Sequence, residues 1–401
     1  MTEFQRLPPE VTYVGLLFGL FVVPKLLERY RIPSAITGLV LGAATSIGLG
    51  MFQHDATVSL FSALGITALF LFAGMEVDVA ELRRAARVLI EHLLVRVLAL
   101  ALGTWVAWRW LGLGVRPAAL LALALLTPST GFILDALRTL DLSEQAKFWV
   151  RSKAVATELL ALAVMFLTLQ SADARQLGIS AAVLVGMVLL LPLLFRVFAA
   201  VVVPHAPRSE FAFLIIVATV CALVTRRLGV YYLVGAFVVG MVARGFRQRL
   251  PAMSSEKMLH AVEAFASVFV PFYFFHAGLE IRRDDLSLEA LWWTAAFVGL
   301  VIPFRLALVS LHRRWRLGET WREGLGVSVP MLPTLVFTLV IAKILREQFG
   351  LPGPVFGGLL GYALVNTMIP AFTMRTPPPE FEAPQLPPMA ARPGGGLSAS
   401  S

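Results

Sequence analysis

FLFAGME, residues 70–76, recurs as FFHAGLE at residues 274–280, and this pair decides the fold. Alone, the shared Ala-Gly-(Met or Leu)-Glu is too short to mean much. However, ITGLVLG at residues 36–42 precedes the first copy, and the similar LVGAFVVG at residues 233–240 precedes the second. The chain therefore repeats an arrangement of helices rather than a single tetrapeptide.

Two further matches follow the FLFAGME and FFHAGLE copies in the same order. Arg96 in VRVLAL corresponds to Arg305 in FRLALV, and TPSTG at residues 127–131 corresponds to VPMLPTL at residues 329–335. Four matches in one order indicate a duplicated unit. Because an odd number of predicted spans separates the two copies, the two units are expected to be inverted in the membrane, as in many secondary transporters.

Composition places the duplicated unit in a lipid bilayer. Of the 401 residues, 58% are hydrophobic and 15% are charged, and the mean hydropathy is +0.79. Apolar runs of roughly 17 to 25 residues recur, each long enough to cross about 30 Å of hydrocarbon as a helix. The sequence predicts an all-α polytopic membrane protein. The thirteen predicted spans are residues 11–27, 33–51, 57–75, 88–110, 117–137, 147–169, 178–203, 209–225, 230–244, 258–280, 290–311, 323–345 and 352–374.

Basic residues predict the orientation. With the N-terminus outside, most of the 34 Lys and Arg fall in cytoplasmic loops, as the positive-inside rule requires. The net charge of +9 is thus an orientation feature, and no basic patch interleaved with aromatic residues suggests nucleic acid. Residues 1–374 form the predicted transmembrane domain, and residues 375–401, rich in Pro, Gly and Ser, a disordered cytoplasmic tail. All-helical spans predict a bacterial inner membrane.

Two of the predicted spans are interrupted by proline. The first interruption contains Thr127, Pro128, Ser129, Thr130 and Gly131, and the second contains Pro330, Pro333 and Thr334. Proline removes a backbone donor and clashes with the preceding turn, so each helix should break within the membrane. Freed carbonyls and hydroxyls are costly in lipid but suit a cavity that coordinates a cation. Two interruptions in matching halves therefore predict a transport site.

Glu158 is the carboxylate that this site needs. It lies near the middle of its span, within RSKAVATELLALAVMF at residues 151–166. A carboxylate there is costly unless it is protonated, paired with a cation or bound to an ion, and these are the states of an exchange cycle. Arg305 cannot lose its proton and is the candidate counter-charge, whereas Arg96 is expected to be structural. A static ion pair that only orients helices is the alternative.

Four segments together resemble a known family. They are IPSAITGLVLGA, LGITALFLFAGMEVDVAELRR, GVYYLVGAFVVGMVAR and FVPFYFFHAGLEIRRDDL. They are similar to helices of the monovalent cation/proton antiporter superfamily, particularly its sodium/proton exchanger and potassium-efflux branch, over residues 11–374. The resemblance implies a homodimer, in which a dimerisation domain anchors a mobile core with two crossed, interrupted helices that moves in an elevator-like step.

The resemblance also assigns residues. The ion-binding Asp of the family falls at Glu158, the residue before it at Thr157, and the basic residue of a later core helix at Arg305. Thr130 or its neighbours occupy the first crossover. Glu in place of Asp adds one methylene and shifts the carboxylate, which leaves the ion preference open. One carboxylate and one permanent counter-charge predict one proton exchanged per cation.

The predicted function is a secondary antiporter that exchanges protons for sodium or potassium. Two alternatives stay open: a non-transporting membrane sensor or scaffold with this fold, and a symporter on the same inverted-repeat plan. The six histidines and one cysteine have no ligand spacing, so no metal site is predicted beyond the transported cation. No cofactor is expected, and no nucleophile with a base at suitable spacing suggests an enzyme.

Overall fold

The computed structural model describes residues 8–131, 133, 137, 142–206, 209–229, 233–245 and 256–374, and the predicted tail at residues 375–401 lies outside them. All regular structure in the described residues is helical. Eight of these helices are long and apolar enough to cross a membrane, and three shorter apolar stretches, Ser34–Leu49, Val115–Leu126 and Val234–Gly245, accompany them. The prediction of an all-α polytopic membrane fold is confirmed.

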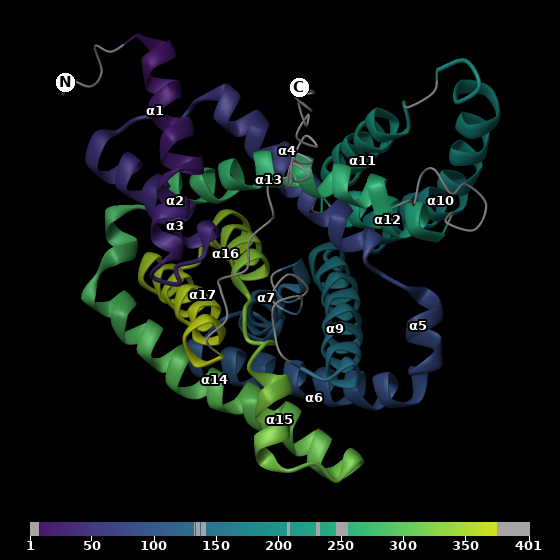
Figure 1. Ribbon diagram of the computed structural model, residues 1–401. Helices are drawn as coiled ribbons and strands as arrows, with labels where there is room; N and C mark the ends of the chain where they lie inside the picture. Colours follow the sequence, from purple (N-terminus) through teal and green to yellow (C-terminus); the bar gives the residue numbers. More distant parts are fainter. Residues whose placement is uncertain are drawn as a thin grey trace, which may run out of the picture.

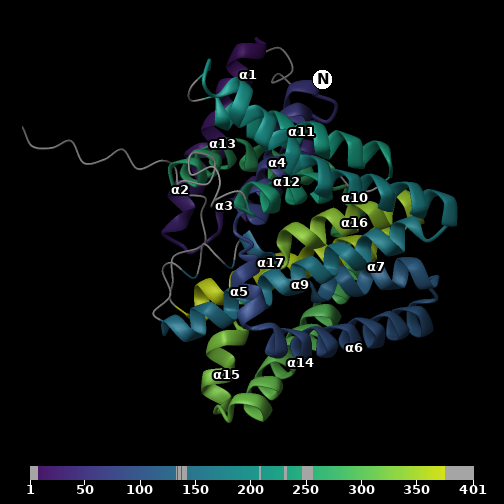
Figure 2. The same ribbon diagram turned by 90° about the vertical axis from the view of Figure 1, so that its right-hand side faces the viewer.

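The helices form two bundles (Figures 1 and 2). The α4 bundle consists of α1 (Pro9–Phe21), α2 (Val23–Glu28), α3 (Ser34–Ala44), α4 (Ala56–Met75), α11 (Glu210–Arg227), α12 (Leu233–Gly245) and α13 (Glu256–Leu279). The α9 bundle consists of α6 (Ala86–Leu111), α7 (Val115–Leu126), α9 (Glu144–Gln170), α14 (Leu288–Leu317), α15 (Trp321–Ser328), α16 (Leu335–Phe349) and α17 (Gly353–Thr373). The remaining described elements are α5 (Val79–Arg84), α10 (Ala174–Val197), η2 (Thr45–Leu49), η3 (Phe198–Val202) and η6 (Arg283–Leu286).

Each copy of the motif packs against a glycine-containing helix of the other repeat. Gly74 of FLFAGME faces Gly240 of α12, and Gly278 of FFHAGLE faces Gly42 of α3. A Cβ added at Gly240 would lie 2.2 Å from the Leu71 carbonyl oxygen, and one at Gly278 would lie 2.1 Å from that of Leu39. Only glycine permits backbones this close, so the recurrence of the motif follows from two equivalent helix crossings.

Polar contacts between helix ends lie at two opposite ends of the molecule. At one end, the α16 end, Lys343 of α16 pairs with Glu280, which directly follows α13, and Arg283 donates to the Ile47 carbonyl. At the opposite end, the α15 end, Arg316 of α14 lies 2.9 Å from Glu91 of α6. The two motif copies finish at different ends, because Glu76 follows α4 near Arg244 and Asp78 rather than near Lys343. This arrangement is what inverted copies require.

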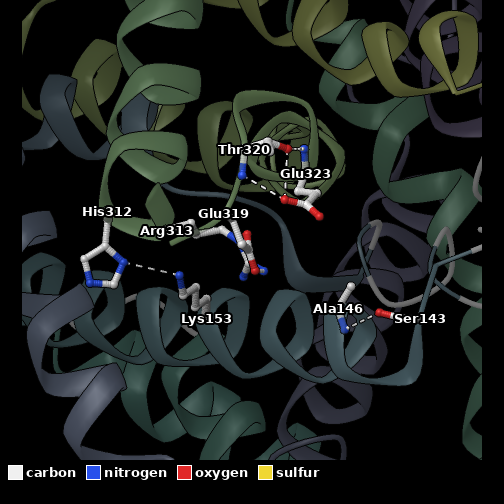
Figure 3. A network of polar contacts seen from close by, with 8 residues as sticks. All are labelled: Ser143, Ala146, Lys153, His312, Arg313, Glu319, Thr320 and Glu323. Carbon is white, nitrogen blue, oxygen red and sulfur yellow. Dashed lines mark hydrogen bonds and ion pairs between the residues drawn. The ribbon is translucent and has the colours of Figure 1, made fainter. Parts of the chain in front are cut away.

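The long helix α9 crosses the whole α9 bundle. Its first turn is capped by the Ser143 side chain, which accepts from the Ala146 backbone N–H at 3.2 Å (Figure 3). Its 27 residues span about 40 Å, so Glu158 lies near the middle. Helix α7 packs beside it, and α16 packs against α7.

Candidate functional site at the helix crossover

The first interruption begins where α7 ends. Thr127 takes an extended conformation (φ −86°, ψ 121°), and the chain becomes helical again at Thr130. Pro128 has no N–H to continue the helix, which explains the break. The matching interruption runs from the end of α15 at Ser328 to the start of α16 at Leu335. Both predicted interruptions are present in the structure.

The two interruptions cross and bind each other through hydrogen bonds. The Ser129 backbone N–H donates to the Pro333 carbonyl at 2.7 Å, and the Ser129 hydroxyl accepts from the Val336 N–H at 3.2 Å. The Thr338 hydroxyl donates to the Ala124 carbonyl at 2.8 Å. Backbone N–H and carbonyl groups that lose their helical partners at one interruption therefore form hydrogen bonds with the other interrupted helix.

Helix α17 supports the second interruption with a buried amide. Asn366 accepts from the Thr334 N–H at 3.3 Å and donates to the Thr334 hydroxyl at 2.9 Å. The Thr338 hydroxyl lies 2.8 Å from the Thr334 hydroxyl, and all three side chains are buried. Pro333 and Thr334 were predicted from the sequence, whereas Asn366 and Thr338 were not.

Arg305 binds the backbone of the crossover. Its Nη1 donates to the Leu332 carbonyl at 2.8 Å and to the Tyr362 hydroxyl at 3.0 Å, and its Nη2 donates to the Met331 carbonyl at 2.7 Å. Tyr362 in turn donates to the Leu125 carbonyl at 2.6 Å. A cation suits carbonyls at the C-terminal end of a half-helix. Within the described residues, Glu158 is not among the partners of Arg305, so the predicted pairing is not a direct contact here.

Glu158 faces a cavity at the seam between the bundles. Its side chain is 3% exposed, and Oε2 has no hydrogen-bond partner in the structure. The cavity measures about 10 Å³, which is room for one water or one dehydrated ion. Its lining consists of Leu69, Phe70 and Ala73 from α4, Ser129, Thr130 and Gly131 from the first crossover, Glu158, and Val336 and Phe337 from α16. The Thr130 hydroxyl is likewise buried without a partner.

The structure thus brings together some of the predicted residues and not others. Glu158, Ser129 and Thr130 share one cavity, whereas Thr127 and Thr157 are buried but outside its lining. The Thr157 hydroxyl donates to the Lys153 carbonyl at 2.7 Å and lies 3.1 Å from Nε2 of His92 on α6. Thr157 therefore contacts another helix of its own bundle.

Three further basic side chains are buried in the α9 bundle, outside the lining of the Glu158 cavity. Arg96 is 2% exposed, with Nε and Nη1 unpartnered, and Lys153 is 0% exposed, with Nζ 3.4 Å from Nδ1 of His312 (Figure 3). Arg313 forms two parallel hydrogen bonds to Glu319, one of them 2.6 Å long. Lys153 lies within the predicted span 147–169, and the structure buries it more than two turns into α9.

The fold and the site define a membrane transporter made of two inverted repeats, with interrupted helices that cross beside a buried carboxylate. The chain belongs to the transmembrane family of sodium/hydrogen exchangers, whose family model matches residues 16–376. It is therefore a multi-pass membrane protein of a transporter family rather than of an enzyme family. The resemblance inferred from the sequence is confirmed.

Individual relatives are consistent with this family. The chain is 24% identical over 384 residues to the Na(+)/H(+) antiporter NhaS5 of Synechocystis sp., covering 90% of this chain but 52% of the relative, so it spans about half that protein. It is 24% identical over 365 residues to probable Na(+)/H(+) antiporter 3 of Methanocaldococcus jannaschii, covering 87% and 92%. The structure of the sodium proton antiporter MjNhaP1 from the same organism at pH 8 has the same fold, with a TM-score of 0.66 at 15% identity and coverage of 90% and 96%.

Proposed function

We propose that the chain exchanges protons for sodium or potassium ions across a membrane, with Glu158 holding the proton and the cation in turn. The observation that carries this proposal is a buried carboxylate oxygen without a partner, facing an ion-sized cavity beside the crossover. A protonated Glu158 is neutral and can stay buried at low cost. An ionised Glu158 requires a compensating cation, so the proton and the cation cannot be bound to Glu158 at the same time.

The ligands of the cation follow from the hydrogen bonds already made. The carbonyls of Met331, Leu332 and Pro333 accept from protein donors, and the Ser129 hydroxyl accepts from a backbone N–H. Oε2 of Glu158 and the hydroxyl of Thr130 have no such partner, so we assign them to the cation. Arg305 keeps its charge throughout and acts through the crossover backbone, which leaves one proton exchanged per cation.

The two bundles support an elevator-type step. Glu158 and both crossovers belong to the α9 bundle, while Leu69, Phe70 and Ala73 of the α4 bundle cover the cavity. Sliding the α9 bundle along α4 would move the cavity from one membrane face to the other without rebuilding the site. In agreement with the family resemblance, we propose a homodimer anchored by the α4 bundle in a bacterial inner membrane.

The test is proton flux in proteoliposomes that contain a pH-sensitive dye, with sodium, potassium or lithium added in turn. The wild type should give cation-dependent proton movement, and Glu158→Gln should abolish it. Glu144→Gln is the matched control, because Glu144 begins the same helix but its side chain is 91% exposed. This control should transport normally.

Three other outcomes are informative. A folded protein that responds to no cation would contradict exchange and favour a sensor or scaffold. Anion uptake driven by sodium would favour a symporter. Activity retained in Glu158→Gln would show that another group carries the proton.

A further inference from the structure

An apolar groove opens on the outer side of the α9 bundle, away from the α4 bundle. We call it the α7 groove, because α7 forms its floor while α6 and α14 form its walls (Figure 2). Its volume is about 240 Å³, and every residue that lines it is apolar. Leu121 and Leu125 of the floor are buried, whereas Leu102 and Leu300 of the walls are 49% and 69% exposed. The α7 groove is therefore deep and open to the surroundings of the protein.

These surroundings are the hydrocarbon of the bilayer. Both walls, α6 and α14, are long and apolar enough to cross a membrane. Water does not fill an apolar cavity, and an empty cavity loses the dispersion contacts of its lining. An apolar cavity of about 150 Å³ can hold one benzene molecule, so the larger α7 groove has room for a segment of an acyl chain.

The α7 groove runs from the middle of the membrane to the α16 end. Helix α6 starts at the α15 end, where Glu91 meets Arg316, and therefore finishes at the α16 end. Its share of the lining extends from Ala99, in the middle of the helix, to Leu111, its last residue. An acyl chain that enters at the α16 end thus reaches the depth of the first crossover.

Two residues at the α16 end of α6 suit a phospholipid headgroup. Arg109 follows Leu102 by seven residues, and Trp110 follows Gly103 by seven, which is about two helical turns. Both side chains thus continue the groove side of α6, and both are exposed. An arginine binds a phosphate through parallel hydrogen bonds, and tryptophan is enriched at the depth of lipid headgroups.

We propose that the α7 groove binds one acyl chain of an anionic phospholipid, whose phosphate lies beside Arg109. The bound chain packs against α7, the half-helix that leads into the first crossover. The Leu125 carbonyl of α7 accepts from the Tyr362 hydroxyl at 2.6 Å, and Thr127 follows α7 directly. The lipid therefore supports the position of the crossover from the outer side of the bundle. This inference requires the membrane location of the chain and does not rest on ion exchange.

Photolabelling in proteoliposomes tests the proposal without relying on transport. The vesicles contain phosphatidylethanolamine and phosphatidylglycerol, with a small share of phosphatidylglycerol that carries a diazirine in the middle of one acyl chain. After illumination, mass spectrometry locates the adducts. The wild type should carry adducts on α7, at Leu121 or Leu125, in addition to those on exposed residues. An acyl chain that stays outside the α7 groove does not reach these buried side chains.

Filling the α7 groove should remove the adducts on α7. Ala107→Phe fills the groove from α6 and should lower their yield by roughly tenfold, because the added ring and the acyl chain would overpack the same space. Val301→Phe fills it from α14 and should do the same. Ala101→Phe is the matched control and should leave the yield unchanged, since Ala101 is exposed on α6 outside the lining. Arg109→Gln should lower the yield about fivefold, the contribution of one basic residue near an anionic lipid surface.

Three results would overturn the proposal. The first is a wild type with adducts only on exposed residues such as Leu102 and Leu300. The second is an unchanged yield on α7 in folded Ala107→Phe or Val301→Phe protein. The third is a disulfide-linked dimer of Leu300→Cys in a Cys221→Ser background, which would show that a second copy of the chain covers the groove. An unchanged yield in Arg109→Gln would refute the placement of the headgroup.

Discussion

Replacing Tyr362 with phenylalanine should weaken the junction between the two interrupted helices. Its hydroxyl donates to the Leu125 carbonyl on one side and accepts from Arg305 on the other. Arg305 in turn holds the Met331 and Leu332 carbonyls. A single oxygen atom therefore links the end of α7 to the second crossover.

The expected cost follows from these two contacts. A neutral buried hydrogen bond contributes about 0.5–1.5 kcal/mol, and one to a charged group about 1.5–3 kcal/mol. Arg305 keeps its two carbonyl partners, so the charged contact should count toward the low end of its range. The ring stays in place, and no large cavity is created. Tyr362→Phe should therefore lower the free energy of unfolding by about 2–3 kcal/mol.

Unfolding in mixed detergent micelles with increasing sodium dodecyl sulfate measures this change. Tyr30→Phe is the matched control, because the Tyr30 side chain is 55% exposed and its ring contact with Arg29 survives the substitution. The same proteoliposome assay should show that Tyr362→Phe needs more cation for half-maximal proton flux. A loss below about 0.5 kcal/mol, typical of a surface substitution, would refute the reasoning.

Two further predictions concern packing and charge. Gly240→Ala should cost about 1–3 kcal/mol of stability, because the added Cβ would lie 2.2 Å from the Leu71 carbonyl oxygen. Gly245→Ala is the control and should be close to neutral, because the space around Gly245 is open. Thermal unfolding compares the two variants, and equal midpoints would contradict the close helix crossing at Gly240. A double-mutant cycle with Arg313→Leu and Glu319→Leu should give a coupling energy of about 1–3 kcal/mol, and a value near zero would show that the paired geometry contributes nothing.

The sequence predicted the fold because its main features are local and repeated. Apolar length predicts a span, and a glycine that recurs in FLFAGME and FFHAGLE marks a backbone contact wherever the partner helix lies. The prolines at 128 and 333 predict breaks in the same way. What the sequence did not reveal is which helix each glycine faces, since that depends on the packing of both repeats.

The site was predicted less completely, for reasons visible in single residues. Glu158 is conspicuous because a carboxylate in an apolar span is expensive. Tyr362 and Asn366 are not, because a neutral polar side chain in a helix has many local partners and its real partner lies on another helix. Thr157 was assigned as a ligand by the family resemblance, in which the residue before the ion-binding carboxylate takes part. Adjacent residues on a helix point about 100° apart, however, so the two side chains face different neighbours.

Arg305 was predicted to balance the charge of Glu158, but its hydrogen bonds in the structure point to a different role. The sequence suggested that the carbonyls freed by the helix breaks coordinate the transported cation. In the structure Arg305 occupies the Met331 and Leu332 carbonyls and therefore takes the place of a cation there permanently. The crossover is electrostatically complete without an ion. Glu158 is then the group whose charge must be balanced by whatever enters the cavity, and this dependence on a single carboxylate is why we place the exchange on it.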